Sequence, residues 1–566
     1  MPHVITQSCC SDGSCVYSCP VNCIHPSPDE PGFADAEMLH IDPGACVDCG
    51  ACVTACPVGA IRHDSRLTPE QLPFAAVNAG YYPPRPAGVK VPLTTQLAPV
   101  TPAPRIHRPG LRVAVVGSGP AGMYAADELL TQVGVTVNVF DKLPTPYGLA
   151  RAGVAPDHPD TRAITALFDR IGAGPGFSYY LNVEVGRHLS HTELLAHHHA
   201  VLYAVGASGD RRLEVQGAGL PGLGSATETV AWINGHPGFA DRMVDLGHER
   251  VVIIGNGNVA LDLARILTAD PNRLAGTDIS DAALRSLRAS SVREVVVAAR
   301  RGPADSAFTL PELIGLASNC DVVLDTGDRD LVLEDLAAAR EPVTLAKLEV
   351  LAGLPEAAGE TRRPRIRLAY RLNPRRVLGP DRVRAVEFNR TGGTGTVTLE
   401  AGLVLTSIGY RGEPIAGLPF DHAASVVPNR EGRVLDPVTG RPVTGAYVAG
   451  WIKRGPTGFI GTNKSCAMQT VAALAEDFNA GLLDDPVHRP SALRRLVRAR
   501  QPDVVDGDGW RAIDAAEIAR GAAFGRPRVK FTSVQDMLAV ARQRMSGPRA
   551  RLRRVGDLVP ARHRLR

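Results

Sequence analysis

Two glycine-rich turns, each placed between a predicted strand and a predicted helix, constrain most of the chain. In the first, residues 113–116 are apolar and precede glycines in the G-x-G-x-x-G spacing. Such glycines allow a tight turn, close approach of the backbone to a pyrophosphate, and close packing of helix on strand. The next predicted strand, residues 135–140, ends in Asp141, where an acid can accept hydrogen bonds from a ribose. This order predicts a dinucleotide site on a parallel sheet. The three glycines are Gly117, Gly119 and Gly122.

The second glycine-rich turn indicates a different nucleotide. Residues 251–254 are apolar, and Gly255-Asn-Gly-Asn-Val-Ala260 follows them, with Ala in place of the third glycine. The next predicted strand, residues 294–299, ends in Arg300 and Arg301 rather than in an acid. Guanidinium groups bind phosphate bidentately, so this pair favours the 2′-phosphate of NADP over the ribose of NAD. The alternative is that the two arginines only form a solvated face.

The N-terminal segment carries a cysteine pattern that is typical of iron–sulfur proteins. The chain has 11 cysteines, and nine of them lie in the first 56 residues. The run that begins at Cys46 has the spacing C-x₂-C-x₂-C-x₃-C-P, in which the fourth Cys serves the other cluster of a two-cluster ferredoxin. The segment also repeats, because Cys15 aligns with Cys52 and Cys19 with Cys56 at an offset of 37 residues. The pattern predicts a small ferredoxin-like domain with two clusters.

The two halves of this repeat differ, because Asp12 stands where the second half has Cys49. The second site then has four thiolates, as a 4Fe–4S cluster needs, and the first has three, as in a 3Fe–4S cluster. Cys10 or Asp12 could instead complete the first site, which would make it a second 4Fe–4S cluster. Cys23 aligns with Ala60 and is interpreted as a small buried residue. The expected ligands are Cys9, Cys15 and Cys56 at the first site and Cys19, Cys46, Cys49 and Cys52 at the second.

Composition argues against several classes of protein. A net charge of +4 gives no signal for nucleic-acid binding, and no apolar run reaches the length of a membrane span. Residues 1–7 lack the charged and apolar regions of a signal peptide, so we expect a cytoplasmic protein. The run His197–His199 is interpreted as a polar helix end at the surface rather than as a metal site.

Five stretches resemble one known family. They are similar to adrenodoxin reductase, a family of ferredoxin–NADP reductases, over about residues 111–545. Together with the cysteine-rich segment, the chain resembles the bacterial fused ferredoxin/ferredoxin–NADP reductases. The resemblance implies an α/β reductase with two Rossmann-like three-layer nucleotide-binding domains of the glutathione-reductase superfamily type, preceded by a small α+β ferredoxin-like domain. The stretches are Gly117–Gly122, Tyr147–Pro159, Gly255–Asp262, Arg300–Pro303 and Trp451–Ile460.

The resemblance also implies roles for single residues. His158 and Asp262 would form a catalytic proton and charge network near the flavin; a packing histidine and an ordinary polar helix residue are the alternatives. The expected FAD contacts are Gly117, Gly119, Ala121, Gly122, Asp141, Leu149, Val185, Trp451, Gly458, Phe459 and Ile460. The expected NADP contacts are Arg211, Asn256, Gly257, Asn258, Val259, Arg300, Arg301, Glu312 and Gly458.

These assignments divide the chain into six parts. Prolines make residues 66–110 a semi-rigid linker, in which residues 71–77 could form a short helix. The parts are an iron–sulfur domain (1–65), the linker (66–110), an FAD-binding domain in two pieces (111–215 and, with the C-terminal region, 346–545), an NADP-binding domain (216–345) and a basic tail (546–566).

The expected function is that of an FAD-dependent ferredoxin–NADP(+) oxidoreductase with a built-in ferredoxin domain. A hydride would pass between NADPH and FAD, and single electrons would then pass to the iron–sulfur clusters. The external acceptor would be a ferredoxin or a cytochrome P450-type enzyme. The alternatives are electron flow in the reverse direction, a glutamate-synthase-like subunit, and clusters that are only structural or sensing.

Overall fold

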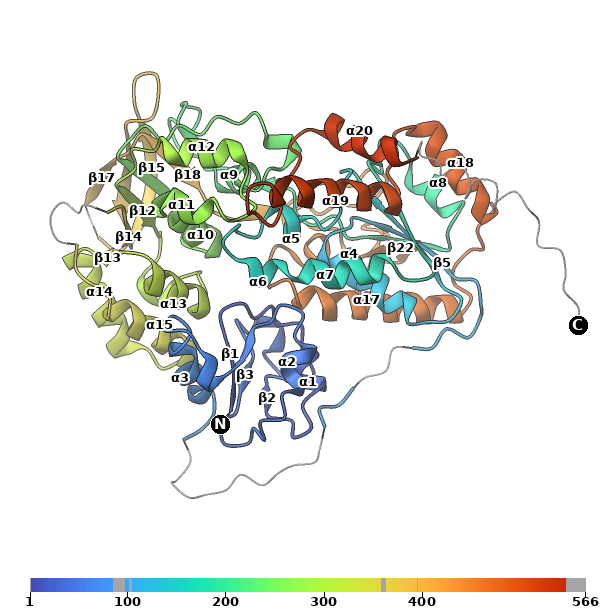
Figure 1. The fold of residues 1–566 in the computed structure, drawn as a ribbon, viewed down its shortest axis with the longest axis horizontal. Coiled ribbons are helices and arrows are strands. Elements are labelled where there is room, and N and C mark those ends of the chain that lie inside the picture. The colour runs from blue at the N-terminus through green and yellow to red at the C-terminus, as the bar shows by residue number, and fades with distance from the viewer. Residues whose placement is uncertain (1, 85–96, 101–103, 358–362, 394, 546–566) are drawn as a thin grey trace, which may run out of the picture.

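The computed structural model describes residues 2–84, 97–100, 104–357, 363–393 and 395–545. Three domains are visible in Figure 1, where the N-terminal domain lies below the junction of the other two. We call them the cluster domain (residues 2–84), the first nucleotide domain (111–203 with 412–545) and the second nucleotide domain (223–406). The predicted basic tail and the middle of the predicted linker fall outside the described residues. No helix in the described part of the chain has the length and apolar composition needed to cross a membrane.

The cluster domain has the two-fold repeat that the sequence predicts. Its strands pair as β1 with β4 and β2 with β3, both antiparallel. The left-handed backbone of Ser11 and Gly13 recurs at Asp48 and Gly50, at the same offset of 37 residues. Asp12 and Cys49 therefore occupy equivalent corners of the two halves. The elements are β1 (His3–Ile5), α1 (Ser14–Tyr17), β2 (Ile24–His25), η1 (Phe33–Asp35), β3 (His40–Ile41), α2 (Ala51–Ala55), β4 (Ile61–His63), η2 (Asp64–Arg66) and α3 (Pro73–Gly80).

Helix α3 belongs to the cluster domain rather than to a free linker. Its Phe74 is buried in the core of this domain. The amide oxygen of Asn78 accepts hydrogen bonds from Ile5 N (3.2 Å) and Ile41 N (2.9 Å), and Nδ2 donates to Ile5 O (2.8 Å). The linker predicted from residue 66 thus starts later than expected, because α3 ties strands β1 and β3 together.

The first nucleotide domain is built on a seven-stranded sheet with the order β20-β21-β22-β8-β5-β6-β7, in which β22 to β7 are parallel. Alternate residues of β5 enter opposite cores: Val113 and Val115 pack under α4 and α17, and Ala114 and Val116 pack on the other face. Its strands are β5 (Arg112–Val116), β6 (Thr136–Asp141), β7 (Phe177–Leu181), β8 (Ala200–Tyr203), β20 (Asn429–Arg430), β21 (Arg433–Leu435) and β22 (Pro442–Val448). Its helices are α4 (Pro120–Leu130), α5 (Leu149–Ala152), α6 (Pro159–Arg162), α7 (Ile164–Gly172), α8 (His191–Leu195), α16 (Trp451–Arg454), α17 (Thr462–Asn479), α18 (Pro490–Arg500), α19 (Gly507–Ala522) and α20 (Val534–Met545).

The second nucleotide domain has a six-stranded parallel sheet, β10-β18-β11-β12-β14-β13, with helices on one face. A three-stranded antiparallel sheet packs on the other face. Its strands are β10 (Leu223–Ser225), β11 (Arg250–Ile254), β12 (Glu294–Ala298), β13 (Val322–Leu324), β14 (Arg365–Ala369), β15 (Leu372–Leu378), β16 (Ala385–Arg390), β17 (Thr396–Glu400) and β18 (Leu403–Thr406). Its helices are α9 (Ala226–Ile233), η3 (Pro237–Phe239), α10 (Asn258–Thr268), α11 (Pro271–Leu274), α12 (Asp281–Arg288), η4 (Pro303–Asp305), α13 (Leu310–Asn319), α14 (Thr326–Ala338) and α15 (Pro342–Ala352).

The chain leaves the second nucleotide domain later than the predicted boundary at residue 345. Strand β14 pairs with β12, and β18 pairs with β11, so both remain in the second sheet. The apolar residues Ile366 and Leu368 of β14 fill the same core as α10. The crossing segments at the two boundaries, β9 (Gly209–Asp210) and β19 (Tyr410–Arg411), pair with each other.

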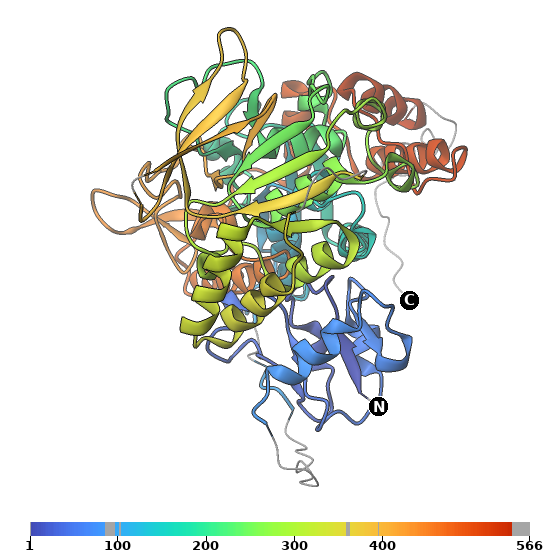
Figure 2. The same cartoon turned by 90° about the vertical axis from the view of Figure 1, so that its left-hand side faces the viewer.

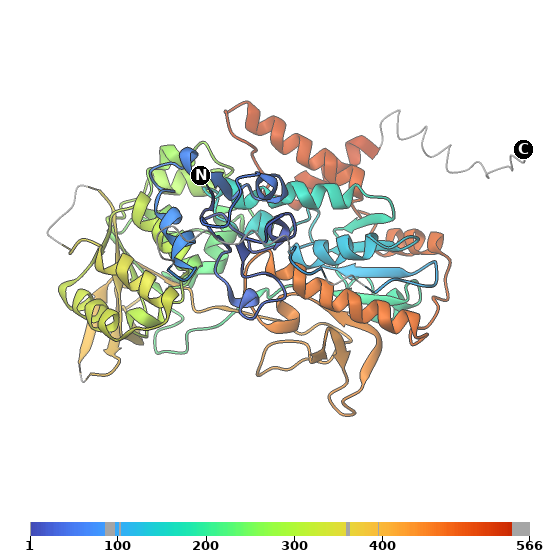
Figure 3. The same ribbon diagram turned by 90° about the horizontal axis from the view of Figure 1, so that it is seen from below.

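The cluster domain contacts both nucleotide domains. It lies at the bottom of Figures 1 and 2, with α19 and α20 at the top, and it is in front in Figure 3, which is the view from below. Cys10, Val58 and Ala60 pack into the core of the first nucleotide domain. Leu310 and Ile314 of α13 pack into the core of the cluster domain. The three domains thus share apolar cores.

We expect Asn78→Ala to destabilise the cluster domain. The substitution leaves the buried N–H groups of Ile5 and Ile41 without their acceptor, which costs about 1–3 kcal/mol for each unsatisfied group. The measurement is the urea midpoint for loss of the cluster absorbance in the full chain, with the exposed Asn373→Ala as the control. Equal midpoints for both variants would contradict the assignment of α3 to this domain.

Candidate functional site

The first glycine-rich turn is shaped to hold a pyrophosphate. Gly117 has a φ of +102°, and a Cβ there would lie 2.4 Å from Ala204 O. A Cβ on Gly122 would lie 1.9 Å from Gly117 O, so only glycine fits where α4 meets the turn. A Cβ on Gly119, in contrast, would meet no atom within 4 Å. The turn therefore presents open space at the N-terminus of α4, where backbone N–H groups favour anions.

Other residues predicted to contact FAD gather around this turn. Asp141, at the end of β6, accepts hydrogen bonds from Ser118 N (2.9 Å) and Ser118 Oγ (2.5 Å). Leu149 at the start of α5 is 39% exposed, although residues 144–147 before it are buried. Val185 is partly buried and packs against the core on the other face of the sheet. An exposed leucine beside an open phosphate cradle fits an apolar part of a cofactor.

The late segment Trp451–Ile460 returns to the same turn. A Cβ on Gly450, just before α16, would lie 2.6 Å from the Cβ of Ala121 on α4. Gly458 has a φ of +80°, and Phe459 N donates to Thr462 Oγ1 (2.9 Å). The indole of Trp451 donates to Thr457 O (3.0 Å). The structure thus brings together predicted FAD contacts that lie more than 300 residues apart in the sequence.

The second turn repeats the geometry of the first. A Cβ on Gly255 would lie 2.1 Å from Ser407 O, whereas a Cβ on Gly257 would meet no atom within 4 Å. Asn258 is held by Thr309, whose N donates to Asn258 Oδ1 (2.9 Å). The amide Nδ2 of Asn256 is buried without a hydrogen-bond partner. A buried donor without a partner beside an open phosphate cradle fits a bound nucleotide. Val259 packs partly into the core below.

Arginines surround the second site at its rim. Arg300 and Arg301 follow β12 and are exposed, and Arg301 Nη1 lies 3.5 Å from Asp305 Oδ1. Arg211 is also exposed, and its backbone N donates to Gly409 O (3.0 Å) next to the crossing strands. The side chains of Arg211, Arg300 and Arg301 are thus accessible from solvent, and their role as NADP contacts stays a prediction.

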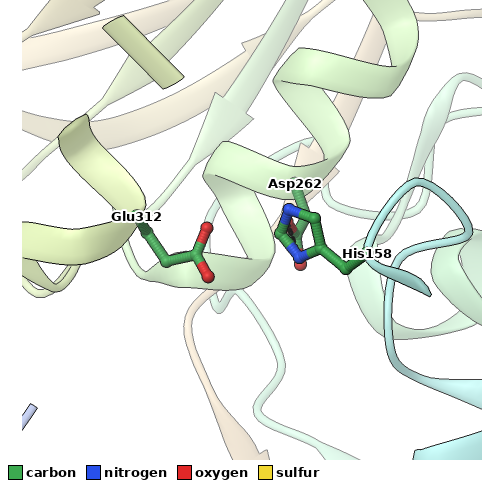
Figure 4. Close-up of side chains that lie close together, drawn as sticks. All are labelled: His158, Asp262 and Glu312. Carbon is green, nitrogen blue, oxygen red and sulfur yellow. Dashed lines mark ion pairs between the residues drawn. The ribbon is translucent and has the colours of Figure 1, made fainter. Parts of the chain in front are cut away.

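Three titratable residues from the two nucleotide domains lie close together, as Figure 4 shows. His158 comes from the start of α6, Asp262 from α10 and Glu312 from α13, and one ligand atom of each lies within 4.8 Å of the others. His158 Nδ1 lies 3.9 Å from Asp262 Oδ1. Arg265 Nη2 donates to the same oxygen of Asp262 (2.7 Å), which fixes that carboxylate. The predicted pair His158–Asp262 is therefore joined by a third group, Glu312.

The cluster domain reaches into this group through Gln7. Its Nε2 donates to Glu312 Oε2 (2.9 Å), and its side chain fills the space over Gly315, where a Cβ would lie 2.3 Å from Gln7 Oε1. Burial raises the pKa of the Glu312 carboxyl. Sequence reasoning missed Gln7, because no motif marks a glutamine two residues before a cysteine; the signal that existed was its place beside Cys9.

The cysteines form two groups with the crossed pattern that the sequence predicts. Burial raises the pKa of the Cys9 thiol to about 11 and that of Cys15 well above its usual value, with neighbouring thiols including Cys56 adding to both shifts. Buried thiols gathered in this way fit iron, which binds them as thiolates. The first sulfur group is Cys9, Cys15 and Cys56; the second sulfur group is Cys19, Cys46, Cys49 and Cys52, and Cys23 lies with it.

Cys23 is buried as predicted, but it also contacts the predicted ligands. Its sulfur lies 3.5 Å from that of Cys19. A hydrogen bond with the Cys23 thiol lowers the pKa of Cys19 to about 6 and that of Cys46 to about 5. The alignment with Ala60 did not reveal this role, because the repeat compares residue positions and not the direction of side chains.

Comparisons with known proteins agree with this geometry. The model of the 4Fe-4S binding domain matches residues 39–62, and that of pyridine nucleotide-disulphide oxidoreductase matches residues 111–289. A "Probable ferredoxin/ferredoxin--NADP reductase" of Mycobacterium bovis is 68% identical over 98% of this chain and 97% of its own length. The mitochondrial "NADPH:adrenodoxin oxidoreductase" of Arabidopsis thaliana is 38% identical over 76% of this chain and 95% of its own.

A solved structure extends the agreement to the fold. Mycobacterium tuberculosis FprA in complex with NADPH superposes with a TM-score of 0.70 at 40% identity, covering 77% of this chain and all of FprA. The predicted fold class and family resemblance are thereby confirmed. The chain belongs to the fused ferredoxin/ferredoxin–NADP reductases, FAD-dependent oxidoreductases that carry a 4Fe–4S ferredoxin domain on the same chain.

Proposed function

We propose that this enzyme oxidises NADPH at the junction of the two nucleotide domains and passes the electrons through its own clusters to an external one-electron acceptor. The convergence of three domains carries the proposal: His158, Asp262 and Glu312 meet there, and Gln7 joins them from the cluster domain. When bound, FAD accepts a hydride from NADPH and releases its electrons singly, which iron–sulfur clusters accept. Because the cluster domain packs on this site, the first electron transfer from the flavin needs no separate ferredoxin.

The residues of the two turns bind and separate the nucleotides. The open space at Gly119 would hold the FAD pyrophosphate, and the carboxylate of Asp141, which accepts from Ser118, would also accept hydrogen bonds from the ribose. Gly257 and the partnerless amide of Asn256 receive the pyrophosphate of NADP. Arg300 and Arg301 bind the 2′-phosphate at the rim, where NAD has only a hydroxyl.

The His158–Asp262–Glu312 group takes up the proton that NADPH oxidation releases. Oxidation of NADPH by two one-electron acceptors releases NADP(+) and one proton. Asp262, fixed by Arg265, orients His158, and Glu312 offers a carboxyl whose raised pKa suits it to hold that proton. The three side chains thus offer neighbouring polar groups that can take up the proton and pass it on.

The two sulfur groups hold different clusters in this proposal. The second sulfur group supplies four thiolates and holds a 4Fe–4S cluster. The first supplies three, and the shared backbone around Asp12 and Cys49 supports the alignment that puts an aspartate in the place of the fourth thiolate. We therefore assign a 3Fe–4S cluster to the first site. The external acceptor is a ferredoxin or a cytochrome P450-type enzyme.

Arg300→Ala should weaken the selection for NADPH. Loss of a charge-assisted phosphate contact costs about 1.5–3 kcal/mol, or roughly ten- to a hundredfold in kcat/KM with NADPH, and leaves kcat/KM with NADH nearly as it was. Steady-state rates with both nucleotides test this, and Arg288→Ala on α12 removes another exposed arginine as a control. An undiminished preference for NADPH would show that Arg300 faces only solvent.

Glu312→Gln should stabilise the protein, and more so at high pH. Because burial raises the Glu312 pKa, the folded state binds this proton more tightly than the unfolded state, so the glutamate costs stability as pH rises above its unfolded pKa. The gain in Tm should be larger at about pH 8 than at about pH 5, while KM for NADPH rises. Glu349→Gln, on the exposed side of α15, should show neither effect. A lower Tm at both pH values would mean that the charge itself holds the site together.

NADPH should reduce the clusters of the full chain without any added ferredoxin. Anaerobic mixing followed by EPR should show loss of the signal of an oxidised 3Fe–4S cluster, which is present in the protein as purified in air. If NADPH bleaches the flavin and neither cluster is reduced, the clusters are structural or sensing. Spectra of two 4Fe–4S clusters would show that Asp12 or Cys10 completes the first site.

A further inference from the structure

The two sulfur groups lie in equivalent halves of the cluster domain, but the halves face different surroundings. The equivalent corners are Asp12 and Cys49. Asp12 is only 8% exposed, whereas Cys49 is exposed. The neighbouring positions differ in the same way, because Cys10 is buried and its counterpart Val47 is 44% exposed. One half of the repeat is thus covered by the reductase, and the other half faces solvent.

The covered corner lies against the start of α17. Gly461 N donates to Cys10 O (2.8 Å), and a Cβ on Gly461 would lie 2.3 Å from Asp12 N, so a larger residue would separate the domains. Lys464, in the first turn of α17, donates to Ser14 Oγ (2.8 Å), and its Nζ lies 3.7 Å from Asp12 Oδ2. Gly461 directly follows Phe459 and Ile460, two of the proposed FAD contacts. The backbone beside the first sulfur group is therefore hydrogen-bonded to the residue that directly follows these two proposed FAD contacts.

The second sulfur group lies beside a cavity that the reductase does not line. The small cavity beside it is lined by residues of the cluster domain alone, among them His3, Val21 and Ile41. Its corner residue Cys49 opens to solvent, with Val47 next to it and Val53 on α2 also exposed. This side of the domain is available to an external protein, and the other side is not.

We propose that the two clusters act in series: the first sulfur group holds the cluster that receives electrons from the reductase, and the second holds the cluster that delivers them to the external acceptor. The proposal rests on the proposed function. For each NADPH oxidised to NADP(+), two electrons enter at the first site one after the other and one proton is released. Both electrons then leave at the Cys49 side, where two molecules of acceptor are each reduced by one electron.

Lys464 is the positioning residue of the entry site in this proposal. Reduction adds a negative charge to a buried site that already contains the carboxylate of Asp12. An ammonium group 3.7 Å from that carboxylate offsets the repulsion and favours the reduced cluster. The start of α17, whose N-terminal end is also positive, adds to this effect. Lys464 thus raises the reduction potential of the first cluster in this proposal.

A pair of matched variants tests the order of transfer. Cys52→Ala removes a ligand of the second cluster, and Cys15→Ala removes the equivalent ligand of the first. In the full chain with Cys52→Ala, NADPH should still abolish the EPR signal of the oxidised first cluster, although reduction of cytochrome c is lost. With Cys15→Ala, NADPH should bleach the flavin and leave the second cluster oxidised, while dithionite, which needs no flavin, reduces it and shows that it is present.

The outcomes separate this inference from the proposed function. If NADPH reduces neither cluster in the unmodified chain, the proposed function fails. If it reduces the first cluster in the unmodified chain but not in Cys52→Ala, whose first cluster still responds to dithionite, then entry is at the second cluster and the inference alone is overturned. Reduction of the second cluster by NADPH in Cys15→Ala, as fast as in the unmodified chain, would overturn it as well.

Variants of Lys464 test the electrostatic part by potential rather than by activity. Lys464→Gln should lower the reduction potential of the first cluster by about 59 mV, roughly tenfold in its one-electron equilibrium, and leave that of the second cluster in place. Lys464→Arg keeps the charge and should restore the potential. Lys347→Gln breaks a different ion pair between the domains, with Glu37, and should not shift either cluster. Equal shifts in Lys464→Gln and Lys347→Gln would show that the lysine only holds the domains together.

Discussion

The packing of the cluster domain against the two nucleotide domains is the contact on which the rest of the molecule depends. Cys10, Val58 and Ala60 enter the core below α4 and α17, while Leu310 and Ile314 of α13 enter the core of the cluster domain. Apolar burial on this scale is not directional, so polar contacts must fix the orientation. Gly461 N to Cys10 O and Gln7 to Glu312 do this at two separate points. A rotation that preserved the burial would leave these buried groups without partners.

The same contact links the cluster domain to the His158–Asp262–Glu312 group, which comes from the two nucleotide domains. His158 and Asp262 belong to different sheets, and the crossing strands β9 and β19 hold those sheets together. Glu312 lies on α13, the helix that also packs on the cluster domain. Any displacement of the cluster domain would therefore change both the surroundings of Glu312 and the first sulfur group. One helix, α13, thus takes part both in the titratable group and in the contact with the cluster domain.

Local sequence patterns predicted the glycine-rich turns and the cysteine groups of this enzyme. They did not predict contacts between residues that are far apart in the sequence. The turns at Gly117 and Gly255 and the crossed cysteine groups follow from spacing, because each depends on residues close in sequence. Helix α3 was predicted only as an option, since the partners of Asn78 lie 37 and 73 residues away. The interpretation of His197–His199 as surface is wrong: all three are buried, and Asn138 is hydrogen-bonded to His198. A run of polar residues is predicted to be exposed when the residues that bury it and bond to it lie far away in the sequence.

The loss of symmetry in the cluster domain follows from what each half faces. A negatively charged side chain at position 12, whether thiolate or carboxylate, lies in a corner that the reductase covers, and burying charge is costly unless it is paired. The carboxylate of Asp12 forms an ion pair with Lys464 of the reductase and accepts a hydrogen bond from Ser14 of the cluster domain. At position 49 water remains, and a cysteine needs no such partner. The two halves of the repeat thus differ both in the residue at the equivalent corner, Asp12 or Cys49, and in whether the reductase covers that corner.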